Sequence, residues 1–510
     1  MAGLDGEFMV GPGFSTHLPL IVIEPLEAVD NAMRALMTVH DAADASTGER
    51  NTLASSGSAG PAFSVLLRRE PGQTLPGKKS YIIELAPTAE NNAPEGIPLA
   101  GLPKDARWRL QGSTRDKGML RNGLAYALGR EIFPEATPET RYCEVLFKKG
   151  DTYQYGGIYI LSETLEHLAR RLSGGTGQPV LLRYDPERDK QRTALKAGDD
   201  LLFGFTLQNR GFSVTYAGDA LAAQEKSRLE ADLNKIESAL HSLKPEVFFG
   251  HTSLLDLQTI VDVYIFNSLM LNADQGPVSL HLYRNAKKQL AWLPDWNFDQ
   301  AIDNAPVRRS PLGFERESVD LEPLSILERR DPVWVQLAGG KTIRDLKLYP
   351  LYDIMDGDQF LWFDRLFLSR PFLNDLRARY YQLRRGALAP ANISALVDTL
   401  ALELGPALER DWRRWEKQYG ATEGPLAVRP YIDADYKVHL RQTCSPDQEL
   451  VKINYCLRFQ DTFLVEQVGG LEGESSNLFD THSHGNRRGL YAFLVIFGFL
   501  AFTYVLMRKL

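Results

Sequence analysis

The chain has 510 residues, of which 44% are hydrophobic, so it is long enough to form two or three domains with cores of their own. Its net charge of −7 argues against a nucleic-acid-binding surface, because such a surface needs a basic patch to neutralise phosphates. The three cysteines lack the spacing of metal ligands, so we expect no zinc site. Cys444 and Cys456 either pair across two strands or stay as free buried thiols, and the sequence leaves both open.

The first part of the chain combines strands with one long helix. Apolar runs bounded by turn residues predict strands at 18–24, 63–69, 80–85, 142–147 and 155–161. Between 25 and 60 the chain is polar and rich in Ala, Ser and Gly, and we expect a long loop with one short helix. Asp116 is a suitable N-cap, and an apolar residue at every fourth position predicts a helix over 116–132.

Two glycines, Gly156 and Gly157, lie inside the second strand of the predicted hairpin 142–161. Glycine within a strand lets another group approach the backbone closely. These two residues could therefore lie over phosphates, or they could only form a β-bulge.

The middle of the chain is predicted to contain both helices and strands. We expect a helix over 163–172, a strand over 180–184, an irregular segment over 185–218, and helices over 224–243 and 254–271.

A second predicted hairpin follows, with strands at 278–283 and 290–293. Asp274 precedes its first strand, and Asp295 and Asp299 follow its second. A hairpin brings its two ends together, so these carboxylates could share one metal site, and Mg²⁺ prefers such hard oxygen ligands. The alternative is that each acid only caps a turn.

The C-terminal part is predicted to contain four successive segments. Helices are expected from about 346 to 418, then strands of a small β module over 425–468, a linker over 469–489 and a transmembrane helix over 490–507. Residues 490–507 carry no charge and are long enough to cross a hydrocarbon core of roughly 30 Å.

No signal peptide is recognisable in residues 1–16. Either the globular part is cytosolic on a tail anchor, or the given chain lacks its original start.

Several common catalytic signatures are missing from the sequence. It contains no GxxxxGK[ST], no GxGxxG and no HRD or DFG triplet, which excludes a P-loop and the standard protein-kinase glycine loop. It contains no GxSxG, so a serine hydrolase of that type is not supported.

Five motifs in order resemble the CotH-type (spore coat protein H) kinase family, over roughly residues 18–418. They are WRLQG at 108–112 with Asp116-Lys117, Arg121-Asn122, the hairpin end from Gly156 to Glu163, Asn272-x-Asp274, and PxWNFD at 294–299. The segment GKKSY at 77–81 fits the start of a strand in that family as well. No single motif is specific, and the resemblance depends on the ordered set.

The resemblance implies an atypical, protein-kinase-like enzyme that uses ATP and Mg²⁺ or Mn²⁺ to phosphorylate proteins, often secreted or surface ones. Matched by position, Asp274 would be the catalytic acid, and Asn297 and Asp299 would hold the metal. Arg183 would be the nucleotide-contacting base and Glu163 the acid that pairs with it.

Two positions depart from the family pattern. Asn297 stands where the family has an acid, and it offers a carbonyl oxygen but no charge to a hard cation. Arg183 stands where a lysine is expected, and the two bases are not equivalent.

We therefore expect an α+β chain with an atypical, two-lobed kinase-like fold over 18–420, followed by the β module and a single C-terminal membrane helix. The expected function is a membrane-anchored kinase acting on a protein, such as an envelope or surface protein, with its globular part outside the cytoplasm. The alternative is a catalytically silent pseudokinase that acts as a surface scaffold.

Overall fold

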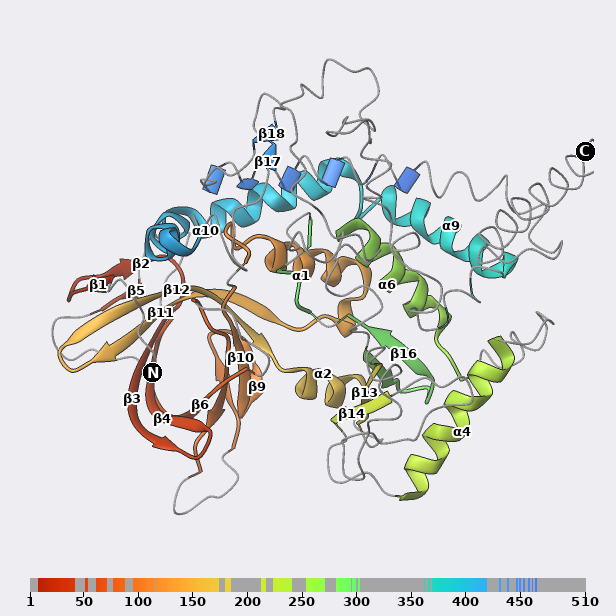
Figure 1. Cartoon of the computed structure of the whole chain (residues 1–510), viewed down its shortest axis with the longest axis horizontal. Helices are drawn as coiled ribbons and strands as arrows, with labels where there is room; N and C mark the ends of the chain where they lie inside the picture. The colour runs from red at the N-terminus through yellow and green to blue at the C-terminus, as the bar shows by residue number, and fades with distance from the viewer. Residues whose placement is uncertain are drawn as a thin grey trace, which may run out of the picture.

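The computed structural model falls into a strand-rich half and a helical half (Figure 1). It describes residues 8–41, 51–53, 61–70, 77–87, 95–113, 115–173, 179–184, 212–216, 223–240, 254–270, 281–294, 296–299, 301–302 and 369–419, together with residues 362, 366, 431–432, 438–439 and eleven positions between 446 and 465.

The strand-rich half is a sheet that closes into a barrel. Its order is β1-β12-β10-β7-β6-β4-β3-β11, and β11 also pairs with β12, so seven strands form a ring with β1 attached outside it. The strands are β1 (Met9–Val10), β3 (Leu20–Val29), β4 (Ala32–His40), β6 (Ala62–Arg69), β7 (Tyr81–Leu85), β10 (Arg107–Gln111), β11 (Thr140–Lys149) and β12 (Thr152–Glu163). The pair β3–β11 is parallel, and the other pairs are antiparallel.

Two short hairpin-like pairs flank the barrel. β2 (Ser15–Thr16) pairs with β5 (Asn51–Thr52), and β8 (Ile97–Leu99) pairs with β9 (Leu102–Asp105).

The prediction of a loop over residues 25–60 is wrong for the part that is described, because β4 lies there. Asp30 and Asn31 form the tight turn between β3 and β4, and Asp30 has the positive φ of 49° that such turns require. The run Ala-Met-Arg-Ala-Leu-Met favours helix by local propensity. Pairing with β3 and β6 overrides it, since strand preference depends mainly on the packing that a strand finds.

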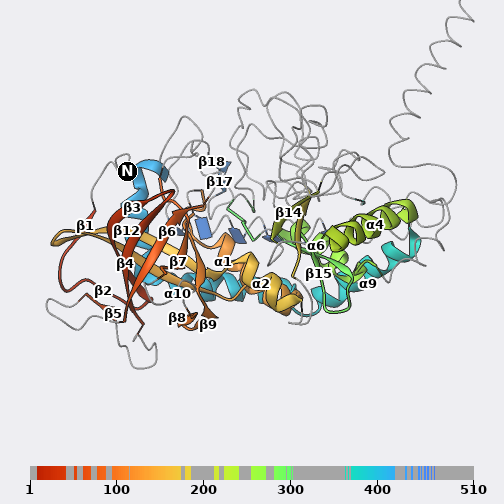
Figure 2. The ribbon, with the colours of Figure 1, turned by 90° about the horizontal axis from the view of Figure 1, so that it is seen from below.

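The barrel interior is filled with hydrophobic side chains from every strand of the ring. Its fully buried members include Ile23 on β3, Met37 on β4, Val65 on β6, Ile83 on β7 and Trp108 on β10. Seen from below, the strands wrap around this core (Figure 2). A closed ring leaves no sheet edge unpaired, so the barrel is a rigid base for the residues at its rim.

A smaller sheet begins the helical half. Its order is β14-β13-β15-β16, built from β13 (Leu181–Tyr184), β14 (Phe212–Tyr216), β15 (His281–Arg284) and β16 (Leu290–Leu293). The hairpin β15–β16 confirms the prediction for this stretch, whereas β14 lies in a segment predicted to be irregular.

The helices of this half are α1 (Arg121–Ile132), η1 (Pro134–Ala136), α2 (Leu165–Leu172), α4 (Ala223–Leu240), α6 (Leu257–Met270), α9 (Arg370–Arg384) and α10 (Pro390–Tyr419). They share one apolar core with the small sheet and with one face of β12. α10 runs from α9 across α1 to the barrel and packs on β12 (Figure 1). It bends at Gly405, which has a non-helical conformation, immediately before Pro406.

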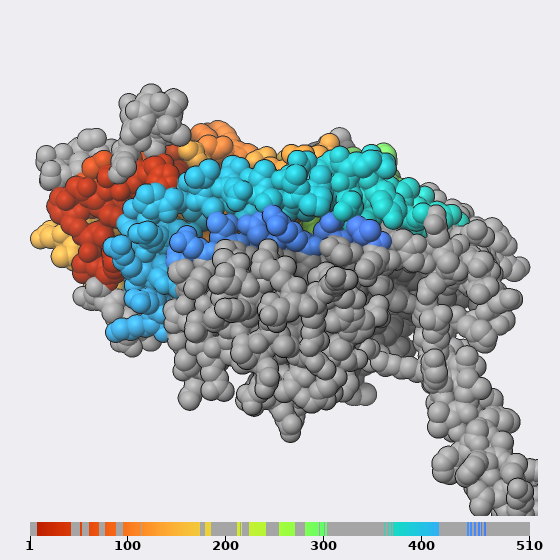
Figure 3. Space-filling view, turned by 90° about the horizontal axis from the view of Figure 1, so that it is seen from above, coloured from red at the N-terminus to blue at the C-terminus, as the bar shows by residue number. Residues whose placement is uncertain are grey.

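The described residues after 445 correct the prediction of a β module over 425–468. β17 (Tyr431–Ile432) and β18 (Val438–His439) do form a short pair, but the described positions between 446 and 465 are helical. Ile453, Leu457 and Leu464 are buried, at the spacing of one helix face rather than of a strand. These residues lie along α9 and α10 (Figure 3).

The expected two-lobed kinase-like architecture is wrong as well. The strand-rich half is a closed barrel of seven strands, and α10 returns from the far side of the helical half to pack on it.

The expectation of a membrane anchor is corrected too. Within the described residues, none of the helices has both the length and the apolar character needed to cross a membrane. Residues 490–507, where that helix was predicted, lie outside the described ranges. The predicted domain boundaries stay predictions.

Candidate functional site

Asp299 lies at the end of a tightly held loop that follows β16. Trp296, three residues earlier, stacks on Tyr126 of α1 with ring centroids 5.2 Å apart. The Trp296 carbonyl accepts hydrogen bonds from Arg109 at 3.1 Å and from the Tyr126 hydroxyl at 3.2 Å. Trp296 has a positive φ of 52°, which for so bulky a residue costs about 1–3 kcal/mol and persists only where packing enforces it.

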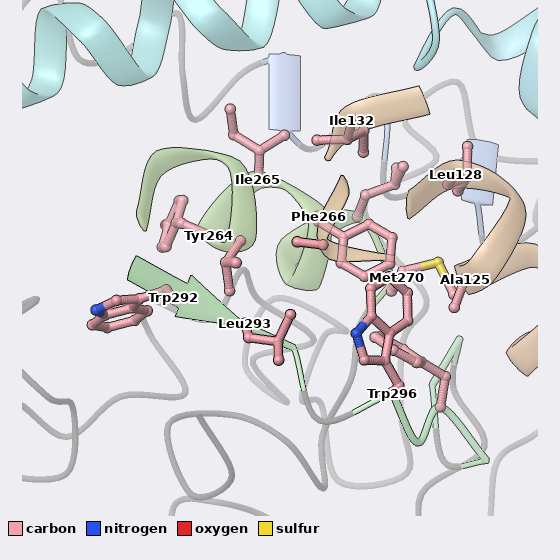
Figure 4. Close-up of a cluster of buried hydrophobic side chains, with 14 of the residues drawn as sticks. Ala125, Leu128, Ile132, Tyr264, Ile265, Phe266, Met270, Trp292, Leu293 and Trp296 are labelled. Atoms are coloured by element: carbon pink, nitrogen blue, oxygen red, sulfur yellow. The ribbon is translucent and has the colours of Figure 1, made fainter. Parts of the chain in front are cut away.

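The packing that enforces this conformation comes from three elements. Figure 4 shows the Trp296 ring among side chains of α1 and α6, such as Leu128 and Phe266, near Leu293 of β16. The loop therefore presents Asp299 from a rigid support.

The Asp299 carboxylate accepts a hydrogen bond from Asn122 Nδ2 at 2.5 Å. The Asn122 side-chain oxygen in turn accepts from the Phe298 N–H at 2.7 Å and from Gln111 Nε2 at 3.2 Å. Both ends of the Asn122 amide are thus fixed, so one residue of α1 orients the acid and the loop that carries it.

Burial raises the pKa of the Asp299 carboxyl to about 6, and the charge of Asp116 adds to the rise. Hydrogen bonds from Ser113 and Asn122 and the charge of Arg109 oppose it without cancelling it. An acid held in its charged form against burial and a like charge is typical of functional sites and of cation sites.

Asp116 belongs to a second, fully buried group centred on Arg121. Arg121 Nη1 lies 2.8 Å from Asp116 Oδ1 and 3.1 Å from Glu449 Oε2. Arg121 Nε also donates to the Ala301 carbonyl at 3.0 Å. One guanidinium therefore ties together the loop before α1, the loop after Asp299 and the C-terminal segment.

The prediction that Asp116 is the N-cap of a helix over 116–132 is half confirmed. α1 begins at Arg121, and Leu120 is its N-cap without a side-chain hydrogen bond. Asp116 Oδ2 nevertheless accepts the Arg121 N–H at 2.7 Å, so it satisfies one of the donors left unpaired at the start of the helix.

A third group connects the barrel rim to α10. Lys78 precedes β7, and its ammonium lies 2.5 Å from Asp411 Oδ1, with both side chains at most 1% exposed. Asp411 also accepts the Ile158 N–H of β12 at 2.8 Å. Burial lowers the pKa of Lys78, while the charges of Asp411, and then of Asp299 and Asp116, raise it.

We call these six residues, Lys78, Asp116, Arg121, Asp299, Asp411 and Glu449, the charged cluster. Lys78 forms an ion pair with Asp411, Arg121 contacts both Asp116 and Glu449, and Asp299 is a further acid.

The charged cluster suits a divalent cation by charge and by donor type. The charge of Asp116 raises the pKa of Asp299, and a cation would favour the ionised form of both acids. Carboxylate, amide and hydroxyl oxygens are the donors that Mg²⁺ and Mn²⁺ prefer. Within the described ranges, no group of three or more His, Cys, Asp or Glu side chains is arranged to hold a metal ion. The case for a cation here therefore depends on two acids, Asp299 and Asp116, together with the side chains of Asn122 and Ser113.

The other residues predicted for the site lie on several different elements or outside the described residues. Asp274 and Asp295 lie outside the described residues. Asn297 lies between the buried Trp296 and Phe298 and is itself partly exposed.

Glu163 and Arg183, expected to pair, have other neighbours in the structure. Among the described residues Glu163 forms ion pairs with Arg171 at 3.0 Å and His167 at 3.6 Å. Arg183 lies on β13, opposite His281 of β15. Their roles toward a nucleotide stay predictions.

The two glycines of β12 lie where the strand bulges. The register with β11 shifts at this point, because Val145 pairs with Gly157 and Leu146 with Tyr155, which leaves Gly156 as the extra residue. A Cβ on Gly157 would lie 2.3 Å from Asp411 Oδ1 and 3.1 Å from Lys78 Cε. Gly157 thus makes room for the buried ion pair, and a contact of either glycine with phosphate stays a prediction.

Sequence reasoning missed Lys78, Asp411 and Glu449 as members of a site. Lys78 was noticed only as part of a strand start, and Arg121-Asn122 only as a motif. Asp411 is 333 residues from Lys78, and Glu449 is 328 from Arg121, so no local spacing connects them.

Residues 73–442 match the family model described as CotH kinase protein. No curated protein matches the chain.

Proposed function

Because the chain belongs to the CotH kinase family, we propose that it transfers the γ-phosphate of ATP to a hydroxyl group of a protein, with Mg²⁺ or Mn²⁺ held at Asp299. The family match covers most of the chain and includes every element that carries Asp299, Asn122, Asp116 and Lys78.

The observation that supports this proposal best is the environment of Asp299. Its carboxylate is fixed by Asn122, carried on a loop that a strained tryptophan anchors, and raised in pKa by burial and by Asp116. Burial and the charge of Asp116 both disfavour the ionised form of Asp299, which suits a residue that binds a cation.

A divalent cation at this site would neutralise the phosphate charge that develops during transfer, which is its usual part in phosphoryl transfer. The protein's own contribution is positional. Asn122 and the Trp296 loop fix Asp299, and Arg121 fixes Asp116, so neither acid has to reorganise when a cation binds.

Lys78 acts through its charge in this proposal. Its ammonium donates to Asp411, to the Ile158 carbonyl at 3.2 Å and to Met119 Sδ at 3.6 Å, which occupies the three donors of a lysine. Lys78 thus holds the bulged end of β12 and α10 beside the acids rather than bonding to phosphate.

Asp274 would orient the acceptor hydroxyl, as the resemblance implies, and Asn297 would lend its carbonyl oxygen to the metal. Arg183, Glu163, Gly156 and Gly157 would contact the nucleotide or support the residues that do. These assignments come from the family pattern and are open to the following test.

The test is transfer of radiolabel from [γ-³²P]ATP to the chain itself and to a general acceptor protein, with and without Mg²⁺. We expect metal-dependent labelling by the wild type and none by Asp274→Ala, with unchanged circular dichroism. Equal labelling by Asp274→Ala would contradict the assignment of that residue. ATP binding without transfer by the wild type would instead favour the silent scaffold.

A further inference from the structure

Strand β10 has one face in the barrel core and the other toward the candidate site. Trp108 and Leu110 belong to the barrel core, so the alternation of side chains along a strand places Arg109 and Gln111 on the opposite face. Gln111 donates to Asn122 of α1, the residue that orients Asp299. Arg109 therefore extends from a rigid barrel strand toward the same loop.

Arg109 connects an acid of the barrel rim to the backbone of that loop. Its Nε lies 2.8 Å from Glu70 Oε1, and its Nη2 donates to Glu70 Oε2 at 3.1 Å. Its Nη1 donates to the Trp296 carbonyl at 3.1 Å. A two-point pair of this kind fixes the plane of the guanidinium as well as its position, so Glu70 sets the direction in which Nη1 points.

The Trp296 carbonyl depends on such a donor because of its backbone conformation. A positive φ of 52° is unfavourable for a bulky residue and persists only where its surroundings enforce it. Tyr126 also donates to this carbonyl, at 3.2 Å, but the hydrogen bond from the charged Arg109 is of the stronger kind. If Trp296 relaxed to an ordinary conformation, Asp299 would move with the loop.

The acid at the other end of this connection is fixed to the closed barrel. Glu70 directly follows β6, and its N–H donates to the Ser80 carbonyl at 3.0 Å. The Ser80 hydroxyl donates to the carbonyl of Gly112, the residue after β10, also at 3.0 Å. The side chains of Glu70 and Arg109 are only 24% and 15% exposed, so water screens their attraction less than that of a surface pair.

We infer that Arg109, held by Glu70, is a positioning residue for Asp299, because it keeps the Trp296 carbonyl in the orientation from which the loop presents that carboxylate. Arg109 acts through the backbone of Trp296. The inference rests on the proposed function, since Asp299 is the acid that the proposed kinase would use.

The first measurement is ¹⁹F NMR of the full chain labelled with fluorotryptophan, in which the Trp296 signal is identified by its loss in Trp296→Phe. Arg109→Lys keeps the positive charge but loses the planar fork, so it cannot hold Glu70 and the carbonyl in the same geometry. We expect it to shift the Trp296 signal. The matched control is Arg68→Lys, which alters an exposed pair with Glu84 on the neighbouring strands β6 and β7 and should leave that signal unchanged.

The second measurement is transfer of radiolabel from [γ-³²P]ATP by the same variants. We expect the rate of Arg109→Lys at saturating ATP to fall about tenfold to a hundredfold, because a small displacement of a site residue has effects of that size. The KM for ATP and the rate of Arg68→Lys should each stay within about twofold of the wild type. This split between rate and KM separates loss of positioning from general loss of binding.

Glu70→Gln covers the case in which Arg109→Lys does not fold, since it keeps the shape of the side chain and removes only the charge. We expect it to shift the Trp296 signal in the same direction and to lower the rate about threefold. In the double variant the loss should equal that of Arg109→Lys alone, because Glu70 acts through Arg109.

An unchanged Trp296 signal and rate in either folded variant would overturn the inference and leave the proposed function standing. A shifted signal with an unchanged rate would reduce Arg109 to a structural role. Absence of transfer by the wild type would remove the proposed function, and the Trp296 signal would still decide whether Arg109 and Glu70 hold the loop.

Discussion

The barrel core is buried, as are all members of the charged cluster except the partly exposed Asp299, but the two regions are stabilised by opposite means. The barrel is filled by apolar side chains such as Met37, Ile83 and Trp108, whose burial is favourable wherever the strands close around them. The charged cluster places two cations and four acids between the barrel rim, α1 and α10, where every charge costs desolvation unless it finds a partner. We therefore expect the apolar core of the barrel to supply most of the folding free energy. The buried charges of the cluster lower that free energy, and we attribute their presence to the function of the candidate site.

Within the cluster, a similar contrast appears between the Lys78–Asp411 ion pair and Asp299. Lys78 and Asp411 form a close ion pair, whereas burial and the charge of Asp116 disfavour the ionised form of Asp299. The predictions below test this distinction, from the largest expected effect on folding to the smallest.

Breaking the Lys78–Asp411 ion pair should destabilise the protein most. Asp411→Asn leaves the Lys78 ammonium buried without its counter-charge, so we expect unfolding to become easier by about 3–5 kcal/mol. The matched control on the same helix is Glu409→Gln, which breaks an exposed pair with Arg413 and should cost under about 0.5 kcal/mol. Urea unfolding of both variants measures the two losses of unfolding free energy. Similar losses would show that the buried Lys78–Asp411 pair stabilises the fold no more than the exposed pair does.

Disturbing the Trp296 loop should have an intermediate effect. Gly129 of α1 lies against Trp296, and a Cβ there would be 2.4 Å from the ring atom Cη2, so Gly129→Ala should cost about 1–3 kcal/mol by overpacking. It should also shift tryptophan fluorescence, because the ring must move, and lower phosphoryl transfer through displacement of Asp299. Gly11→Ala is the control, since nothing lies within 4 Å of the Cβ it would add. Unchanged fluorescence in Gly129→Ala would contradict the tight packing of this loop.

Neutralising Asp299 should stabilise the metal-free protein. Because the folded-state pKa of Asp299, about 6, lies above the ordinary value of 3.8, ionising this acid costs folding free energy, and the cost appears as the pH rises from 3.8 through 6. Asp299→Asn should therefore be more stable than the wild type at pH 7 by on the order of 2 kcal/mol, with little difference near pH 4. Unfolding curves with a chelator at both pH values measure this. A variant less stable than the wild type at pH 7 would show that Asp299 is a structural acid.

The sequence predicts the local parts of this fold well. β6, β7, β11, β12 and the β15–β16 hairpin follow from apolar runs bounded by turns, and α4 and α6 from helical periodicity. β4 is missed because its residues favour helix until they pair with neighbours. The helical segment near Leu457 is mistaken for strands because its apolar residues also fit a short alternating pattern.

Some residues of the candidate site could be predicted from the sequence, and others could not. Asp299 and Asn122 belong to motifs that a family pattern exposes, and the structure places them in contact. Lys78, Asp411 and Glu449 come into contact with their partners only when the barrel closes and the C-terminal part of the chain packs against it. No spacing in the sequence contains that information.

The most direct test of the central claim, that Asp299 holds the cation for phosphoryl transfer, is Mg²⁺-dependent transfer from [γ-³²P]ATP by Asp299→Asn beside the wild type. The account predicts a folded variant whose transfer rate falls about a thousandfold, equivalent to the loss of about 4 kcal/mol of charge stabilisation. A folded Asp299→Asn protein that labels as fast as the wild type, with the same dependence on Mg²⁺, would contradict it.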